Sequence, residues 1–155
     1  KWRLVWEIVN KGASGRNLTG VDLSDADLTN ADLSGATLSL AKLRHADLSD
    51  ADLSDADLGV AALSEADLLR AKMHGADLSM ADLSDADLFG AILRGANLSD
   101  ADLSGATLNQ ADLSGAMLWW ANLSGADLRW AKYTTDTKWP EGFDPRIAGA
   151  VLVED

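Results

Sequence analysis

Residues 46–60 read ADLSD ADLSD ADLGV, three consecutive copies of a five-residue pattern with leucine at the centre. The same spacing runs from Leu18 to Tyr133, which gives 24 central positions five residues apart. Leucine occupies 22 of these positions, and Met73 and Tyr133 occupy the other two. In 22 of the 24 copies an alanine stands two residues before the centre. The fold must therefore accommodate a period of five.

Neither a helix nor a flat strand accommodates that period. Five residues of α-helix rotate a side chain by about 140°, which would scatter the leucines around the helix axis. In a straight strand an odd step places successive leucines on opposite faces. Alanine and leucine, two residues apart, do share one face of an extended segment. The pattern thus predicts short extended segments separated by corners, and coils of this kind stack into a solenoid.

Two copies of the repeat show the full pattern: residues 51–55 read ADLSD and residues 101–105 read ADLSG. In these copies the chain resembles the pentapeptide repeat family, whose consensus is A(D/N)Lxx, and it looks like a cyanobacterial member. The resemblance covers 120 of the 155 residues. It implies an all-β fold, a right-handed quadrilateral parallel β-helix with four pentapeptides per coil and about six coils.

We divide the chain into three parts: an N-terminal cap and linker at 1–15, the pentapeptide-repeat β-helix at 16–135, and a C-terminal capping tail at 136–155. In the cap, apolar residues at positions 2, 5, 6 and 9 follow helical spacing and predict a short amphipathic helix. Its tryptophans, Trp2 and Trp6, would cover the open end of the first coil. A strand is the alternative, since positions 2, 4, 6 and 8 also alternate. The linker at 11–15 is either irregular or an imperfect extra repeat.

The tail carries enough apolar mass to cover the last coil. Asp144 followed by Pro145 is typical of a helix start, so we expect a short helical cap here as well. The apolar residues that we expect to fold over the core are Trp139, Phe143, Ile147, Val151 and Leu152. The family resemblance includes dimers formed end to end through uncovered last coils, and this tail argues against that mode here.

The residue two places after each central leucine lies at a corner, and its type predicts the turn. Stacked at a period of 20, Gly35, Gly75, Gly95 and Gly115 form a column interrupted by Asp55, and glycine there favours type II turns. The column that contains Leu40, Val60, Met80, Asp100 and Trp120 has no glycine after Gly20. For this second column we expect turns with negative φ.

The charge of the chain excludes one large class of function. The formal net charge is −12 and the isoelectric point is near 4.3. Binding nucleic acid through its phosphates requires clustered Lys and Arg, which this composition does not favour. Cysteine is absent, and no apolar run approaches the roughly 18–20 residues of a membrane-spanning helix. We expect a soluble protein of the bacterial cytoplasm, without a cofactor.

No group of residues predicts catalysis, so we do not expect an enzyme. His45 and His74 fall on different faces and lack a nucleophile or second histidine nearby. An acidic column recurs every 20 residues and offers a Ca²⁺ site as one alternative: Asp27, Asp47, Asp67, Asp87 and, after Thr107, Asp127. We favour the interpretation that each aspartate forms hydrogen bonds at its own turn. No metal ligand is therefore assigned.

Outward-facing apolar residues are the candidate sites for a protein partner. Leu40, Val60 and Met80 stack along one corner, and Leu69 and Phe89 stack on another face near Ile92. Stacked apolar side chains form a patch, whereas single ones are common on any surface. Four residues crowd the last coils: Met117, Trp119, Trp120 and Trp130. For the tryptophans we favour packing against the tail over a partner site.

These observations predict a non-enzymatic scaffold that binds a protein partner of unknown identity, with a lateral homodimer as one mode. The repeat carries 19 acidic and 8 basic residues, and the family resemblance implies a first alternative: an acidic DNA mimic that regulates DNA gyrase or a related topoisomerase. The leucine at nearly every central position and the uninterrupted repeat argue against it. A cation-binding structural module is the second alternative.

Overall fold

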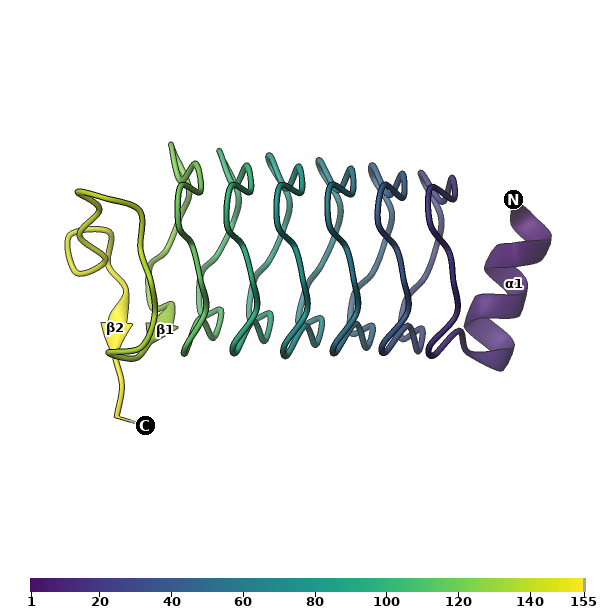
Figure 1. The fold of residues 1–155 in the computed structure, drawn as a ribbon, viewed down its shortest axis with the longest axis horizontal. Coiled ribbons are helices and arrows are strands. Elements are labelled where there is room, and N and C mark those ends of the chain that lie inside the picture. Colours follow the sequence, from purple (N-terminus) through teal and green to yellow (C-terminus); the bar gives the residue numbers. More distant parts are fainter. Residues whose placement is uncertain (155) are drawn as a thin grey trace.

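Residues 1–154 are described by a computed structural model, in which the chain winds into a tower of stacked coils (Figure 1). Helix α1 (Trp2–Lys11) lies across one end of the tower, and the C-terminal tail covers the other. The regular strands of these residues are β1 (Lys132–Tyr133) and β2 (Val151–Leu152), which pair in parallel at the tail end.

Successive coils are joined by parallel bridges between residues 20 apart, for example Asp27 to Asp47 and Asp47 to Asp67. Each pentapeptide contributes one bridging residue, the one before its central leucine. The chain turns between bridges: the Ala56 N–H donates to the Leu53 carbonyl at 3.1 Å, and the same bond recurs along the repeat. Each straight segment is therefore so short that it supplies a single bridging residue in place of a regular strand.

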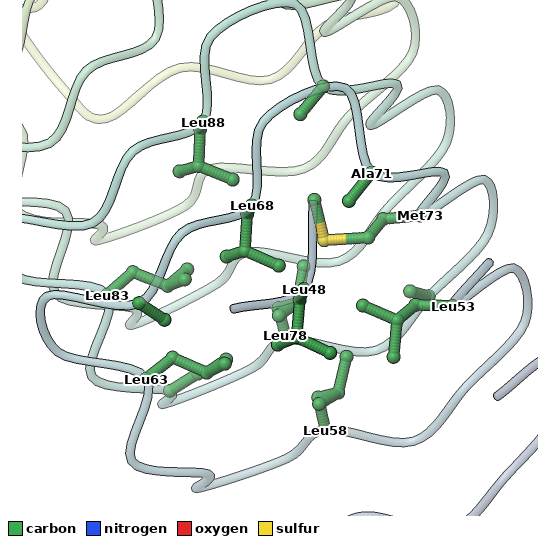
Figure 2. Packing of buried hydrophobic residues seen from close by; sticks show 14 of the residues in the cluster. Leu48, Leu53, Leu58, Leu63, Leu68, Ala71, Met73, Leu78, Leu83 and Leu88 are labelled. Atoms are coloured by element: carbon green, nitrogen blue, oxygen red, sulfur yellow. The ribbon is translucent and has the colours of Figure 1, made fainter. Parts of the chain in front are cut away.

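The interior of the tower is a ladder of leucines with alanines beside them. The central residues from Leu23 to Leu118 are fully buried, and Met73 replaces leucine without gaining exposure. Figure 2 shows Leu48, Leu68 and Leu88, which are 20 residues apart, following one another through successive coils. Full burial of one leucine contributes about 2 kcal/mol. The core therefore accounts for the five-residue period.

Every corner of the tower uses the same turn, whatever residue occupies it. The glycine column has the expected positive φ, 61° at Gly35 and 66° at Gly75. The prediction of negative φ for the second column is wrong: φ is 60° at Leu40, 58° at Val60 and 57° at Trp120. The Leu40 N–H donates to the Gly59 carbonyl of the next coil at 3.0 Å, and the corner residues from Gly15 to Gln110 do likewise. Stacking against the neighbouring coil thus imposes one geometry on the corners that make this bond.

The expected N-terminal helix is present, so the strand alternative is wrong, but the helix packs through another face. Val5 and Ile8 are buried against the first coil, whereas Trp2 and Trp6 are 64% and 56% exposed. Ile8 has no exposed surface, which shows how closely the opening fits branched aliphatic side chains. The expectation that the tryptophans cover the coil is wrong. Within residues 1–154, no helix has the length and apolar character needed to cross a bilayer.

The segment after α1 is an imperfect extra repeat. Gly12, with φ 73°, ends the helix, and its N–H donates to the Ile8 carbonyl at 2.9 Å. Ala13 is then buried and donates its N–H to the Asp32 carbonyl, as Leu18 does to the carbonyl one repeat further on. Alanine thus occupies a central position where the helix already fills part of the core.

The tail forms a strand and a single helical turn where a helical cap was expected. Asp144 caps the turn as predicted: its Oδ1 accepts the Arg146 N–H at 2.9 Å. Gly149, with φ 86°, ends the turn at once, so the described tail residues 136–154 contain no helix. The prediction of a C-terminal helix is wrong because this glycine stops it after one turn. β2 instead adds one more rung beside β1.

Aromatic side chains close the core at the tail end. The bridge between Met117 and Lys138 spans 21 residues instead of 20, so one extra residue enters this coil. Trp139 then occupies a central position, with ring centroids 5.6 Å from Tyr133 and 5.2 Å from Phe143. Three other apolar residues of the tail are exposed, contrary to expectation: Ile147, Val151 and Leu152.

Candidate interaction surface

One corner of the tower presents a column of large apolar side chains to solvent, which we call the first apolar corner. It consists of Leu40, Val60, Met80 and Trp120, with Asp100 interrupting the column. The three residues in consecutive coils are 58%, 49% and 61% exposed, and Trp120 is 77% exposed. Beside Val60, Gly59 has no side chain and Ala62 has a small, half-buried one, so the neighbouring surface carries no bulky side chain. The structure thus keeps the predicted stack of Leu40, Val60 and Met80 together on the outside.

These residues lie in the left-handed region, where an L side chain crowds its own backbone. Such a conformation costs about 1–2 kcal/mol for most residues and is an outlier for a β-branched one. Val60 is β-branched and has φ 58°. Glycine or asparagine would adopt this conformation more easily and would be more soluble. The left-handed conformation of these residues therefore carries a cost that glycine or asparagine would not have.

A second apolar corner is formed by Leu69 and Phe89, with Ile92 beside it. Leu69 is half-buried, while Phe89 and Ile92 are 36% and 37% exposed. Trp130 follows on the same column of corners, two coils further along. The predicted neighbours thus lie together here as well, although they expose less surface than the first apolar corner does.

Basic residues follow the second apolar corner in two coils, and carboxylates on the same face in the adjacent coils neutralise them. Residues 69–74 and 89–94, which follow it, contain Arg70, Lys72, His74 and Arg94 and no carboxylate. The three cations pair with carboxylates of neighbouring coils: Arg70 with Asp50 at 2.9 Å, Lys72 with Asp52 at 4.0 Å and Arg94 with Asp112 at 3.7 Å. In the same two coils, the charged residues before the corner are Glu65, Asp67, Asp85 and Asp87.

The tryptophans near the last coil remain on the surface. Trp119 and Trp120 lie against each other with ring centroids 6.2 Å apart, and Trp119 is 44% exposed. Trp130 and Met117 are exposed as well. The expectation that these side chains pack against the tail is wrong because Tyr133, Trp139 and Phe143 already close the core there.

The aspartates that recur before each central leucine act at their own turns. The Asp27 Oδ1 accepts the Thr29 N–H at 3.1 Å, and Asp67 and Asp102 accept the N–H two residues on at 2.9 and 3.0 Å. Asparagine does the same at position 97. Local hydrogen bonding was the interpretation favoured from the sequence, and the structure confirms it.

The same hydrogen bonds lower the pKa of several carboxyls. The side-chain hydroxyl of Thr29 is the main cause for Asp27, and that of Ser104 for Asp102, with the backbone N–H groups adding to both. The Arg129 guanidinium, which donates to both carboxylate oxygens, holds the pKa of Asp127 far below its usual value. These carboxylates are therefore engaged in their ionised form.

Nothing in residues 1–154 supports the cation-binding alternative. These residues hold no cluster of three or more His, Asp or Glu side chains suited to a metal ion. The His45 Nδ1 lies 3.7 Å from the Glu65 Oε2 on the surface. An open hollow of about 350 Å³ beside Leu123 and Phe143 contains one titratable side chain, Glu141. None of these features predicts a reaction.

The repeat matches a known family model. The model describes pentapeptide repeats and fits eight copies, over residues 17–55, 51–90 and 91–129. No curated protein sequence matches the chain.

Several solved structures are similar to this chain. The structure of alr5209, a pentapeptide repeat protein from Nostoc PCC 7120, is 40% identical and matches 72% of this chain and 84% of its own, with a TM-score of 0.34. HetL from Nostoc sp. strain PCC 7120, a pentapeptide repeat protein involved in regulating heterocyst differentiation, is 32% identical over 89% of this chain and 81% of its own, with a TM-score of 0.40.

A third structure supports the fold alone. A trypsin-treated variant of QnrB1, a plasmid-mediated fluoroquinolone resistance protein, is 22% identical over 91% of this chain and 84% of its own, with a TM-score of 0.52.

Proposed function

Because the chain belongs to the pentapeptide repeat family, we propose that it is a non-enzymatic scaffold that binds a protein partner through the first apolar corner. Proteins of this family are generally structural or interaction scaffolds and not enzymes. The corner supplies the surface for this role, since Leu40, Val60 and Met80 are exposed in consecutive coils. We place this scaffold in the bacterial cytoplasm.

We further propose that the tower is the right-handed quadrilateral β-helix of this family, with about six coils over residues 16–135. Residues 1–15 then form its N-terminal cap and residues 136–155 its capping tail. The parallel bridges between residues 20 apart support a coil of that length. The hydrogen-bonded turn in each pentapeptide supports four sides per coil.

The observation that carries the proposed function is the backbone conformation of Val60. A β-branched side chain at φ 58° is strained, and because Val60 is 49% exposed, burial offsets only part of that cost. Strained residues retained at a surface are concentrated at functional sites. Leu40 and Met80 add apolar surface on either side, as the centre of a protein interface requires.

The test is the triple substitution Leu40→Asn, Val60→Asn and Met80→Asn. Asparagine adopts the left-handed conformation readily and removes the apolar surface, so the fold should be retained. Photo-crosslinking in cells of the native host, followed by mass spectrometry, should give a specific protein adduct with the wild type. The triple variant should lose that adduct.

A matched control lies on the next corner of the same coils. His45→Asn, Glu65→Asn and Asp85→Asn are the same change at exposed residues with positive φ, 55°, 58° and 57°. This control should capture the partner as the wild type does. Equal capture by all three proteins would show that the first apolar corner does not bind the partner.

An acidic DNA mimic acting on DNA gyrase is the second candidate, and the surface charge favours it. The repeat carries 19 acidic and 8 basic residues, and its aspartates lie in columns along the tower. A supercoiling assay with purified gyrase tests the proposal. Inhibition that is lost when the Asp47, Asp67 and Asp87 column is changed to Asn would support mimicry. An unchanged supercoiling rate at tens of micromolar wild-type protein would rule it out.

A further inference from the structure

We propose that the last coil binds an extended, basic peptide segment of a partner protein, which adds one parallel rung beside residues 121–124. The site is the hollow of about 350 Å³ between residues 121–124 and residues 140–143, which we call the end hollow. The inference does not depend on the proposed function, which concerns the stack of Leu40, Val60 and Met80.

The tail leaves one face of the last coil without a following rung. It supplies the next bridging residue for Met117 and for Lys132. Asn122 bridges to the coil before it, but no later residue up to 154 bridges to Asn122. Leu123 is only half-buried, whereas the other central leucines between Leu18 and Leu128 are buried. The core is therefore less covered beside Asn122 than along the rest of the ladder.

The preceding coil shows what a rung supplies to its neighbour. Asn122 donates its N–H to the Ala101 carbonyl at 2.9 Å, and its own carbonyl accepts the Leu103 N–H at 2.8 Å. Two residues further on, the Ser124 carbonyl accepts the Gly105 N–H at 2.9 Å. A rung is thus one residue that offers its N–H and its carbonyl to the preceding coil, followed after two residues by another carbonyl.

The equivalent backbone groups of the last coil are unpaired. The Ala121 carbonyl accepts no backbone hydrogen bond from residues 1–154, and the N–H groups of Leu123 and Gly125 donate none to them. An unpaired strand edge is a template for another extended chain. Because these three groups have the spacing of a rung, an extended backbone parallel to residues 121–125 would satisfy all of them.

The tail does not fill this place itself. The Phe143 N–H donates to the Pro140 carbonyl at 3.1 Å, which closes residues 140–143 into a turn. This turn forms one wall of the end hollow, and residues 121–124 form the other. The space between them falls within about the 300–1,000 Å³ range of ligand pockets. The end hollow therefore leaves room for a segment of another chain.

The lining specifies the side chains of that segment. In a rung the residue after the bridging one points inward, so here it would contact Leu123, with the half-buried Phe143 in the opposite wall. An apolar residue is favoured at that place. Glu141 is the titratable residue of the lining, is exposed, and takes part in none of the ion pairs of residues 1–154. A basic residue of the segment would neutralise it.

The entrance to this face favours a basic residue as well. Trp120 directly precedes Ala121 and is 77% exposed, so a parallel segment would pass its indole before reaching the end hollow. A cation is attracted to the face of an indole ring. A second copy of this chain is disfavoured as the occupant, because each copy carries a net charge of −12. The chemistry thus favours a basic partner segment.

A synthetic peptide that imitates a rung tests the site. In acetyl-Lys-Ala-Asn-Leu-Ser-Lys-amide, the asparagine would take the bridging position and the leucine would point inward beside Leu123. A fluorescently labelled form is titrated with the wild-type chain and followed by fluorescence anisotropy. We expect a dissociation constant on the order of 10–100 µM, because a short flexible peptide must be ordered when it binds.

Two methylated peptides test whether the backbone is recognised. N-methylation of the asparagine removes the N–H that the Ala121 carbonyl would accept, and it should weaken binding at least about tenfold. N-methylation of the leucine removes an N–H that points away from the tower, since successive N–H groups of a strand alternate in direction. This control peptide should bind within about twofold of the parent. Equal affinity of the two methylated peptides would overturn the strand addition.

Substitutions in the chain test the location. Ser124→Trp places a large side chain in the end hollow and should weaken binding at least about tenfold. Tryptophan already occupies the same place of the preceding pentapeptide, at Trp119, so the fold should be retained. Ser64→Trp, on the same face three coils away, is the matched control and should bind as the wild type does. The melting temperatures of both variants check the fold.

A charge substitution tests the preference for a basic segment. Glu141→Gln should weaken binding about two- to fivefold, because it removes one exposed ion pair. Asp136→Asn makes the same change in net charge at another exposed residue of the tail, and its affinity should match that of the wild type. Equal weakening in both variants would attribute the effect to overall charge and contradict a specific role for Glu141.

Three outcomes overturn the peptide site. One is the absence of saturable binding up to about 500 µM chain, well above the expected dissociation constant. Another is equal weakening in Ser124→Trp and Ser64→Trp. The third is a wild-type dimer in sedimentation that Ser124→Trp converts to a monomer, since this would assign the end hollow to a second copy. The proposed function is tested separately, because the Leu40→Asn, Val60→Asn, Met80→Asn variant keeps the end hollow and should bind the peptide as the wild type does.

Discussion

Leu38 and Leu40 are the same residue type two positions apart, and they play opposite parts in this molecule. Leu38 is fully buried, while Leu40 is 58% exposed in a left-handed turn. Both side chains would be counted as core by hydrophobicity alone. Position within the five-residue period therefore decides which apolar residues stabilise the tower and which are available to a partner.

The largest expected effect is at the interior member of that pair. Leu38→Ala leaves a cavity in a ladder that cannot collapse, because the coils on both sides hold their own leucines. We expect a loss of about 2–5 kcal/mol in the free energy of unfolding. Leu40→Ala should change it by less than about 0.5 kcal/mol. Urea denaturation followed by circular dichroism measures both, and similar losses would contradict the distinction.

The alanines of the ladder should resist enlargement. Ala36 is fully buried, and replacing it with leucine would overpack the space beside the stacked leucines, at a cost of about 1–3 kcal/mol. Ala62→Leu, at a half-buried bridging position, serves as the control and should be nearly neutral. If Ala36→Leu were as stable as the wild type, the interior would be looser than the burial indicates.

Val60 and Gly20 lie in the same column of corner residues, so glycine and valine can be exchanged between the two positions. Val60→Gly should raise the free energy of unfolding by about 0.5–1 kcal/mol, because relief of the left-handed strain exceeds the entropy that glycine adds to the unfolded chain. Gly20→Val on the same column should lower it by about 1–2 kcal/mol. Thermal denaturation of both variants checks the pair. A loss of stability in Val60→Gly would mean that the valine is packed.

Acidification should have a smaller effect that comes from the turn aspartates. The pKa values of Asp27 and Asp102 are lowered in the folded chain, chiefly by the hydroxyls of Thr29 and Ser104, so at these two positions the unfolded chain takes up protons first as the pH falls. Their contribution is complete above the unfolded pKa of about 3.9 and is lost as the pH falls through the folded value. The melting temperature should therefore decrease between pH 4 and pH 2.

Asp102→Asn gives the matched comparison, because asparagine makes the same turn bond at position 97. This variant should lose less of its melting temperature between pH 4 and pH 2 than the wild type does. An identical pH dependence would show that this carboxylate does not contribute.

The sequence alone predicted the interior because the period is strict and one residue type fills it. The five-residue step, with alanine two places before leucine, has few physical solutions, and the structure follows them from Leu18 to Tyr133. The local hydrogen bonds of the aspartates were also predictable, since an aspartate two residues before a turn N–H forms this bond in many proteins.

The predictions that failed considered a residue alone and left out its contacts with the neighbouring coil. Val60 and Leu40 were expected to choose their own turns, but the hydrogen bonds to the next coil impose φ on them. Trp2 and Trp6 share a helical stripe, yet the narrow opening of the coil accepts Val5 and Ile8. The extra residue before Lys138, which puts Trp139 at a central position, breaks the period and so could not be read from it.

The melting temperature of the Leu40→Asn, Val60→Asn, Met80→Asn variant tests the central claim, that the ladder stabilises the tower while the first apolar corner is retained at a cost in stability. The variant should melt at or above the temperature of the wild type, because asparagine suits the left-handed turn and the three side chains that it replaces are 49–61% exposed. A melting temperature lowered as far as that of Leu38→Ala would mean that these three side chains belong to the core, and the account would be wrong.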